Sequence, residues 1–131
     1  MSNPSQPPTA PTPPSTAKGD CLFCKIRDGL IPANLVYRDE RVLAFKDIGP
    51  KAPLHLLVIP LEHVETLGEA APGHEALLGH LLLVAAQLAR DGGHADKGFR
   101  VVMNSGVGAG QTVFHMHLHV LAGRSFGWPP G

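Results

Sequence analysis

The 131-residue chain has few cysteines, few aromatic residues and no excess of charge of either sign. Eleven basic residues balance eleven acidic ones, so we expect no nucleic-acid partner and no acidic membrane surface as partner. Two cysteines exclude a disulfide-rich secreted scaffold, and the longest strongly apolar run, Leu81 to Ala86, is too short to cross a bilayer. The amino terminus lacks the pattern of a secretory signal, so we expect a soluble, cytoplasmic protein.

Proline is abundant at one end of the chain. Six of the thirteen prolines lie among the first fourteen residues, beside serine and threonine and with almost nothing to bury. Such a composition cannot offset the entropy of ordering a backbone. We therefore predict a disordered Pro-rich tail over residues 1–18 and one folded domain over residues 19–131, with a PxxP docking site as the alternative role of the tail.

The remaining sequence predicts an α+β domain. Leu22, Phe23 and Ile26 suggest a short N-terminal helix, and apolar residues three and four apart predict one long helix over residues 73–90. Alternating or continuous apolar runs predict an antiparallel sheet of about five strands. The expected strands cover residues 35–37, 42–45, 54–59, 99–103 and 113–121.

The chain has eight histidines, and three of them alternate with apolar residues at His115, His117 and His119. On a strand, alternate side chains share a face, which would place neighbouring imidazoles about 6.5 Å apart, the scale of a phosphate group. Two functions fit this pattern: a three-histidine zinc site, or a row in which one imidazole is a nucleophile. Three residues in a straight row converge poorly on one ion, so we favour the nucleophile.

A loop with three alternating glycines, at residues 104–112, precedes the histidines. Glycines leave backbone N–H groups free to turn toward an anion, so beside the histidines this loop is a candidate phosphate cradle. It is not a dinucleotide-binding fingerprint, because a strand and not a helix is expected after it. Without the histidines, it would equally fit a mobile connection.

The chain resembles the histidine-triad (HIT) family, and within it the Hint branch. The motifs that carry the resemblance extend from Cys21 to the end: CLFCKI at 21–26, IPA at 31–33, AFKDI at 44–48, APLHLLVIP at 52–60, GQTV at 110–113, the triad itself, and WPPG at 128–131. The resemblance implies hydrolysis of the P–N bond of purine nucleoside phosphoramidates, and of aminoacyl-adenylates, with release of a nucleoside monophosphate and without an organic cofactor.

The resemblance also assigns roles to single residues. His117 would be the nucleophile that becomes nucleotidylated, His115 completes the triad, and His119 and His55 would surround the phosphate. To attack, His117 must be a neutral imidazole, so we expect its other ring nitrogen to donate to a backbone carbonyl. Thr112 stands where Hint proteins usually have serine, whose hydroxyl bonds the phosphate and the leaving group. The expected substrate contacts are Asp47 to the ribose, Phe45, Ile48 and Ile31 to the base, and Asn104 with the backbone of Gly110 and Gln111 to the phosphate.

Members of this family are homodimers, so the helix at 73–90 and the strand at 99–103 are expected to form an interface. Trp128 would then reach toward the active site of the partner. A nucleotide-binding regulatory or scaffold protein with vestigial activity stays as one alternative function. Dinucleoside polyphosphate hydrolysis is another, although the terminal WPPG argues against it.

A structural zinc site is the final expectation. Cys21 and Cys24 have the spacing of a metal knuckle, and in some HIT relatives two histidines complete a tetrahedral site. Here these would be His63 and His115, with a reduced thiol pair as the alternative. The other histidines, at positions 74, 80 and 94, lack such a context and are expected at the surface or on the helix side.

Overall fold

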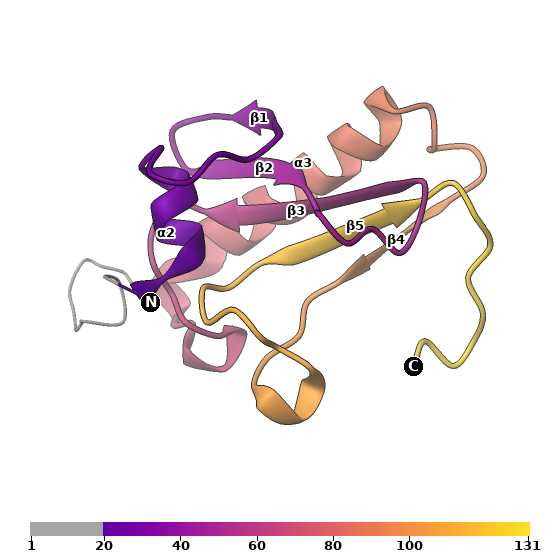
Figure 1. The fold of residues 1–131 in the computed structure, drawn as a ribbon. Helices are drawn as coiled ribbons and strands as arrows, with labels where there is room; N and C mark the ends of the chain where they lie inside the picture. The colour runs from indigo at the N-terminus through magenta and orange to yellow at the C-terminus, as the bar shows by residue number, and fades with distance from the viewer. Residues whose placement is uncertain (1–19) are drawn as a thin grey trace.

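The computed structural model describes residues 20–131, so the predicted Pro-rich tail lies outside the described residues. Five strands form one antiparallel sheet in the order β1-β2-β3-β5-β4 (Figure 1). Their bounds are β1 (Leu35–Arg38), β2 (Val42–Lys46), β3 (Leu54–Pro60), β4 (Phe99–Val102) and β5 (Leu118–Ala122). The predicted α+β architecture is confirmed.

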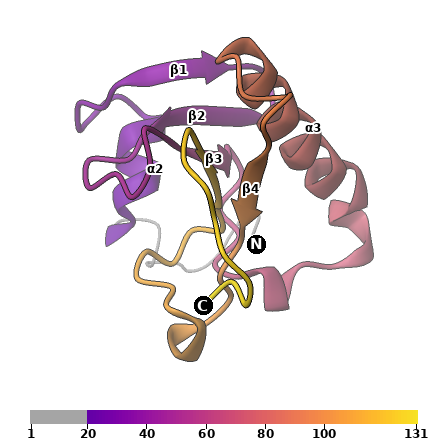
Figure 2. The same cartoon turned by 90° about the vertical axis from the view of Figure 1, so that its right-hand side faces the viewer.

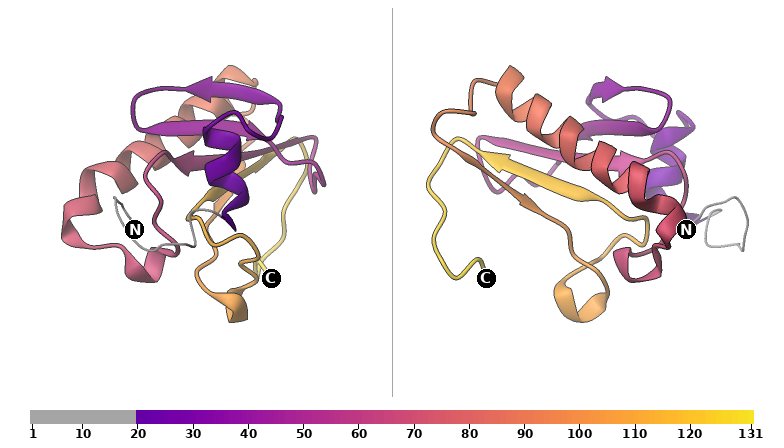
Figure 3. Two further views of the ribbon diagram at one scale, coloured as in Figure 1. Left: turned by 60° about the vertical axis from the view of Figure 1, so that its left-hand side comes forward. Right: turned by 180° about the vertical axis from the view of Figure 1, so that it is seen from behind.

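Helices cover both faces of the sheet. The long helix α3 (Glu75–Asp91) follows a short 3-10 turn, η2 (Pro72–His74), and packs on one face, whereas α2 (Leu22–Arg27) lies on the other (Figures 2 and 3). The remaining 3-10 turns are η1 (Leu67–Glu69) and η3 (Val107–Ala109). No helix among residues 20–131 is long and apolar enough to span a membrane.

Each face of the sheet has its own core because β3 is apolar on both sides. Under α3, its residues Leu81, Val84 and Leu88 belong to a buried cluster with Val58 and Val120 of the sheet. On the opposite face, apolar residues of α2 pack with apolar residues of β2 and β3. This second cluster includes Phe23, Ile26, Leu43, Phe45, Leu57 and Ile59.

The predicted last strand is wrong in its first half. Residues 113–117 lie outside the sheet, and only β5 from Leu118 onward pairs with β3 and β4. Two bonds divert this segment: the Met116 N–H donates to the Val64 carbonyl at 2.7 Å, and the His115 carbonyl accepts from the His117 ring. His115 therefore does not share a strand face with His117 and His119.

The strand register defines the face away from α3. Val120 and Leu56 pack under α3, so the alternate residues of β5 and β3 face the other way. On that opposite face, residues paired across strands form two neighbouring rows. One row holds His55, Leu121 and Arg100, and the next holds Leu57, His119 and Val102.

Candidate active site and metal centre

His117 is held by a single well-formed bond that decides which ring nitrogen is available. Its Nδ1 lies 2.8 Å from the His115 carbonyl oxygen. A carbonyl only accepts, so Nδ1 carries the hydrogen and the neutral ring has its lone pair on Nε2. The Phe23 ring packs edge-on against the imidazole, with 5.0 Å between ring centroids. His117 is therefore oriented as a nitrogen nucleophile requires.

His119 and His55 continue from His117 as a chain of imidazoles, and we call these three residues the imidazole chain. The rings of His117 and His119 lie 5.1 Å apart, and His55 Nε2 lies 2.9 Å from His119 Nδ1. The Lys51 backbone N–H donates to His55 Nδ1 at 2.9 Å, so His55 carries its hydrogen on Nε2 and donates it to His119. His119 is left with an Nε2–H donor.

Burial keeps the imidazole chain neutral. It lowers the pKa of His117 and of His55 below the ordinary value for histidine. Burial, together with the neighbouring rings of His117 and His55, lowers the pKa of His119 to about 4. At neutral pH the chain therefore offers a lone pair on His117 and a hydrogen-bond donor on His119, not a row of cations.

Asp47 lies beside His55, at the end of the imidazole chain farthest from His117. Its Oδ2 lies 3.4 Å from His55 Nε2, while its Oδ1 accepts the Gly49 N–H at 2.8 Å. Asp47, His55 and His119 also bring one oxygen and two nitrogens within 4.8 Å of one another. The structure thus places the predicted ribose-binding carboxylate beside the predicted phosphate-binding histidines.

The predicted base-binding residues differ widely in exposure. Phe45 is buried in the core against Phe23, with 5.4 Å between ring centroids, and Ile31 is half-buried against the same cluster. Ile48 is fully exposed. Of the three, only Ile48 presents its whole side chain to a ligand, so their shared role as a base pocket stays a prediction.

The glycine loop is fixed from inside by Gln111, a role that the sequence did not reveal. Its buried amide accepts the Gly106 N–H and donates to the carbonyls of Glu65 and Val113, at 2.8 to 3.0 Å. The backbone N–H groups of Gly110 and Gln111 donate to the carbonyls of Val107 and Gly106. A phosphate would have to replace these bonds, so the phosphate cradle stays a prediction.

Three other predicted site residues form no hydrogen bond with any other residue among 20–131. Thr112 is exposed and lines a shallow pocket of about 290 Å³ with Leu22 and Phe114. Asn104 is half-buried at the end of β4, and Trp128 is 85% exposed. The contacts of these three residues with substrate or with a partner subunit stay predictions.

A second group of side chains lies between α2 and the start of the triad, and we call it the metal cluster. It consists of Cys21, Cys24, His63 and His115, all buried, with their ligand atoms within 4.8 Å of one another. The Nδ1 atoms of His63 and His115 lie 3.2 Å apart, and Cys24 Sγ lies 3.2 Å from His63 Nδ1. Two sulfurs and two imidazole nitrogens match the donor set of a closed zinc site.

The local structure prepares this cluster for a cation. Cys21 is the N-cap of α2, and its sulfur accepts the Cys24 backbone N–H at 3.2 Å. A hydrogen bond from the Cys24 thiol lowers the pKa of Cys21 and raises that of Cys24. The Pro60 carbonyl accepts from His115 Nε2 at 2.8 Å, which leaves the lone pair on the Nδ1 that faces the thiols. The residues present therefore fit a structural zinc ion.

Comparison with known proteins identifies the family to which this chain belongs. The HIT domain profile matches residues 28–126, which is most of the chain. The chain belongs to the HIT domain family. It is 54% identical over 112 residues to an uncharacterized HIT-like protein of Synechocystis, an alignment that covers 86% of this chain and 97% of that protein.

Solved HIT structures share the fold. A HIT family hydrolase from Legionella pneumophila superimposes with a TM-score of 0.83 at 48% identity, over 85% of this chain and 99% of that one. A more distant histidine triad nucleotide-binding protein from Candida albicans gives a TM-score of 0.70 at 31% identity, over 83% and 82% of the two chains.

In this HIT domain, backbone groups orient three of the histidines. The prediction that a backbone carbonyl accepts from His117 is confirmed by the His115 carbonyl. Sequence reasoning missed the Pro60 carbonyl beside His115 and the Lys51 N–H beside His55, because backbone groups carry no side-chain signal. Gln111 did stand in a recognised motif, but its side-chain role depends on Glu65, far away in sequence.

Proposed function

We propose that this HIT protein is a nucleotide hydrolase that cleaves the P–N bond of purine nucleoside phosphoramidates through a covalent intermediate on His117. The observation that supports this most directly is the 2.8 Å bond from His117 Nδ1 to the His115 carbonyl, which reserves Nε2 for attack. The hydrolase named among its structural relatives and the nucleotide-binding protein among them support the same class. Aminoacyl-adenylates, which also present an α-phosphorus, are the second proposed substrate.

The proposed reaction has two steps. Nε2 of His117 attacks the α-phosphorus, a P–N bond to the ring forms, and the bond from phosphorus to the leaving amine breaks. Water then attacks the same phosphorus, releases the nucleoside monophosphate and returns the neutral imidazole. The leaving amine takes up a proton from the solvent in the first step. The water consumed in the second step supplies the oxygen on phosphorus and replaces that proton.

His119 supports the charge that develops on the phosphoryl oxygens. Because the pKa of His119 is lowered to about 4, it acts at neutral pH as an N–H donor and not as a cation. His55 acts through His119, since it donates to His119 Nδ1 and thereby keeps the hydrogen on Nε2. His55 is in this sense a positioning residue, and Asp47 is proposed to bind the ribose hydroxyls.

The direct test is to trap the intermediate. The protein is mixed with a purine nucleoside phosphoramidate, quenched in base to preserve a phosphorus–nitrogen bond, and digested for mass spectrometry. We expect one nucleotidyl group on the peptide that contains His117, and none in His117→Ala. Turnover without label on His117 would overturn the mechanism, and nucleotide binding without turnover would favour the regulatory alternative.

We also propose that the metal cluster holds a structural zinc ion through Cys21, Cys24, His63 and His115. When bound, zinc would link α2 to the segment that carries the nucleophile. The support is the buried Cys2His2 donor set and the orientation of His115 by the Pro60 carbonyl. Elemental analysis of protein purified without chelators should find about one zinc per chain.

A homodimer is the proposed assembly. β4 is an edge strand, and α3 exposes Leu82 and Leu83 at 54% and 69%. An edge with unpaired backbone groups beside exposed leucines is a surface that a second copy would cover. Light scattering of the full chain should give twice the mass of 13.9 kDa, and a monomer would contradict this proposal.

A further inference from the structure

The β2–β3 loop, residues 47–53, carries two groups that the proposed active site uses. Asp47 lies at its start, and the Lys51 backbone N–H donates to His55 Nδ1 at 2.9 Å. This N–H selects the tautomer of His55 and, through the bond to His119 Nδ1, leaves the hydrogen of His119 on Nε2. The imidazole chain therefore depends on where the backbone of Lys51 is held.

The β2–β3 loop has little packing of its own to hold it. Apart from Asp47 and Ala52, its residues are exposed. Inside the loop, Asp47 Oδ1 accepts the Gly49 N–H at 2.8 Å, and Lys51 Nζ donates to the Gly49 carbonyl at 2.9 Å. Each of these bonds joins residues two apart in the chain, so they shape the loop without attaching it to another element.

The segment after β5 contacts the β2–β3 loop at two points. Arg124 Nε donates to the Lys51 carbonyl at 2.8 Å. One residue earlier, Gly123 lies so close to Pro53 that an added Cβ would stand 2.8 Å from the Pro53 Cβ. Gly123 also has a φ of +96°, which residues with a side chain rarely adopt. Both contacts come directly after the N–H that bonds His55, so they fix the backbone of the loop at that point.

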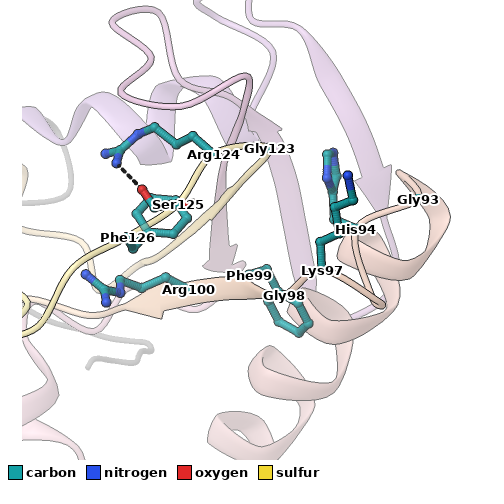
Figure 4. Close-up of a pocket in the computed structure, with 10 residues that line it drawn as sticks. All are labelled: Gly93, His94, Lys97, Gly98, Phe99, Arg100, Gly123, Arg124, Ser125 and Phe126. Atoms are coloured by element: carbon teal, nitrogen blue, oxygen red, sulfur yellow. Dashed lines mark hydrogen bonds between the residues drawn. The ribbon is translucent and has the colours of Figure 1, made fainter.

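Arg124 is itself held by contacts within its own segment. Its guanidinium carbon lies 4.3 Å from the centroid of the Phe126 ring, and its Nη1 donates to the Ser125 carbonyl at 2.9 Å. Figure 4 shows the Phe126 ring between Arg124 and Arg100, whose guanidinium carbon lies 5.1 Å from the same centroid. Because a guanidinium is planar, contacts that fix its end also fix the direction of the Nε–H that meets Lys51.

We propose that Arg124 is a positioning residue of the active site, because it holds the Lys51 backbone that selects the tautomer of His55. Arg124 Nε bonds the Lys51 carbonyl, and the Lys51 N–H bonds His55 Nδ1. His55 Nε2 then bonds His119 Nδ1. All of these bonds lie within one chain, so a second copy that covers the segment after β5 would leave them in place. The effect of Arg124 on catalysis rests on the proposed function, whereas its effect on the His55 tautomer does not.

Three substitutions separate the Nε–H donor of Arg124 from its charge. Glutamine carries an amide nitrogen at the same place along the side chain as arginine Nε, whereas methionine has a similar length and no donor. Arg124→Gln therefore keeps a donor for the Lys51 carbonyl and Arg124→Met loses it, while both lose the charge and the cation contact with Phe126. Arg124→Lys keeps the charge but places its nitrogen one atom farther out. Any change of assembly that comes from losing the charge affects the first two variants alike.

Nitrogen-15 NMR of the imidazole rings measures the effect directly, after thermal unfolding has shown that the variants are folded. At neutral pH the unmodified protein should carry the hydrogen of His55 on Nε2. Arg124→Met should give a mixture of the two His55 tautomers, because Asp47 Oδ2, 3.4 Å from His55 Nε2, still favours a hydrogen there. Arg124→Gln should keep the pattern of the unmodified protein. Arg100→Met should keep it too, since Arg100 contacts the same Phe126 ring but donates to the Gly127 carbonyl and not to the loop.

Turnover of a purine nucleoside phosphoramidate gives the second readout. We expect Arg124→Met to lower kcat by about tenfold, the scale of one hydrogen bond from a charged donor, and to change KM by less than about twofold. The loss belongs to kcat because the His119 donor acts on charge that develops in the transition state. Arg124→Gln should restore most of the rate, and Arg124→Lys should rank between the two.

Two results would overturn the positioning role of Arg124. One is a His55 tautomer in Arg124→Met that equals that of the unmodified protein. The other is a rate that follows the charge, with Arg124→Lys normal and Arg124→Gln as slow as Arg124→Met. If the unmodified protein does not turn over the phosphoramidate, the proposed function fails, and the His55 tautomer alone decides about Arg124.

Discussion

The metal cluster and the imidazole chain begin at histidines only two positions apart, yet they use opposite ring nitrogens. His115 offers Nδ1 to two thiols because the Pro60 carbonyl accepts from its Nε2. His117 keeps its hydrogen on Nδ1 because the His115 carbonyl accepts it, and so offers Nε2. Two identical side chains therefore receive different chemistry from the backbone groups beside them.

The metal cluster and the imidazole chain also differ in their burial and in the contacts among their members. Every member of the metal cluster is buried, and its ligand atoms face one another, which is the arrangement of a closed site. In the imidazole chain His55 is hydrogen-bonded to His119, and the His117 ring contacts the His119 ring at 5.1 Å between centroids. His55 and His117 are buried, whereas His119 is half-buried. The first group is suited to hold an ion permanently, and the second to meet a ligand that enters and leaves.

The largest expected effect is a loss of activity when the nucleophile is removed, with the metal cluster left intact. His117→Ala should lower kcat/KM for a phosphoramidate by at least about a thousandfold, because no other described imidazole offers an oriented Nε2 lone pair at this position. Steady-state kinetics measures the loss, and zinc content serves as the control, which should not change. Activity within tenfold of the unmodified protein would refute the role of His117.

The converse change should break the metal cluster. Cys24→Ser removes one sulfur ligand from a buried site, so we expect less bound zinc and a free energy of unfolding lower by at least about 3 kcal/mol. Urea unfolding with elemental analysis measures both quantities. His94→Ala is the control, since His94 follows α3 and lies near the start of β4, at the opposite end of the sheet from the cluster. Equal zinc content in Cys24→Ser and in the unmodified protein would be evidence against the site.

A smaller effect concerns the loop that leads into both groups. Gln111→Ala removes the amide that bonds the Gly106 N–H and the carbonyls of Glu65 and Val113. We expect a loss of about 1–3 kcal/mol in the free energy of unfolding, because buried backbone groups lose their partner. Thr112→Ser, at the exposed neighbouring position, should change stability by less than about 0.5 kcal/mol. Equal stability of the two variants would contradict the bracing role of Gln111.

The smallest effect is a pH dependence of stability that comes from the imidazole chain. The pKa of His119 falls from 6.5 when unfolded to about 4 when folded, so between these values the unfolded chain binds the extra proton. The free energy of unfolding should therefore decrease as the pH falls from about 6.5 to about 4. His119→Gln should flatten this slope in urea titrations across the window, and an unchanged slope would show that His119 does not carry it.

Much of the fold could be predicted because its signals are local. The spacing of leucines in α3 and the apolar run of β3 depend on neighbouring residues, and both elements lie where the sequence predicted them. The segment at 113–117 failed the same reasoning. Its alternation is that of a strand, but bonds to Val64 and within the triad hold it out of the sheet.

The candidate site was predictable in its residue types and less so in its geometry. Spacing and resemblance found the four members of the metal cluster, which the structure brings together. No local pattern could pair Arg100 with Arg124 around Phe126, because β4 and the segment after β5 meet only through the sheet. His94, expected at the surface or on the helix side, lines a pocket formed by residues 93–100 and 123–126.

The central claim is that His115 and His117 hold opposite tautomers, and nitrogen-15 NMR of the imidazole rings tests it directly. At neutral pH, long-range proton–nitrogen correlation spectra should show His117 protonated on Nδ1 with an unprotonated Nε2. His115 should carry its proton on Nε2, with Nδ1 unprotonated or shifted by a bound metal. The same tautomer in both rings, or a doubly protonated His117 at pH 7, would contradict the account.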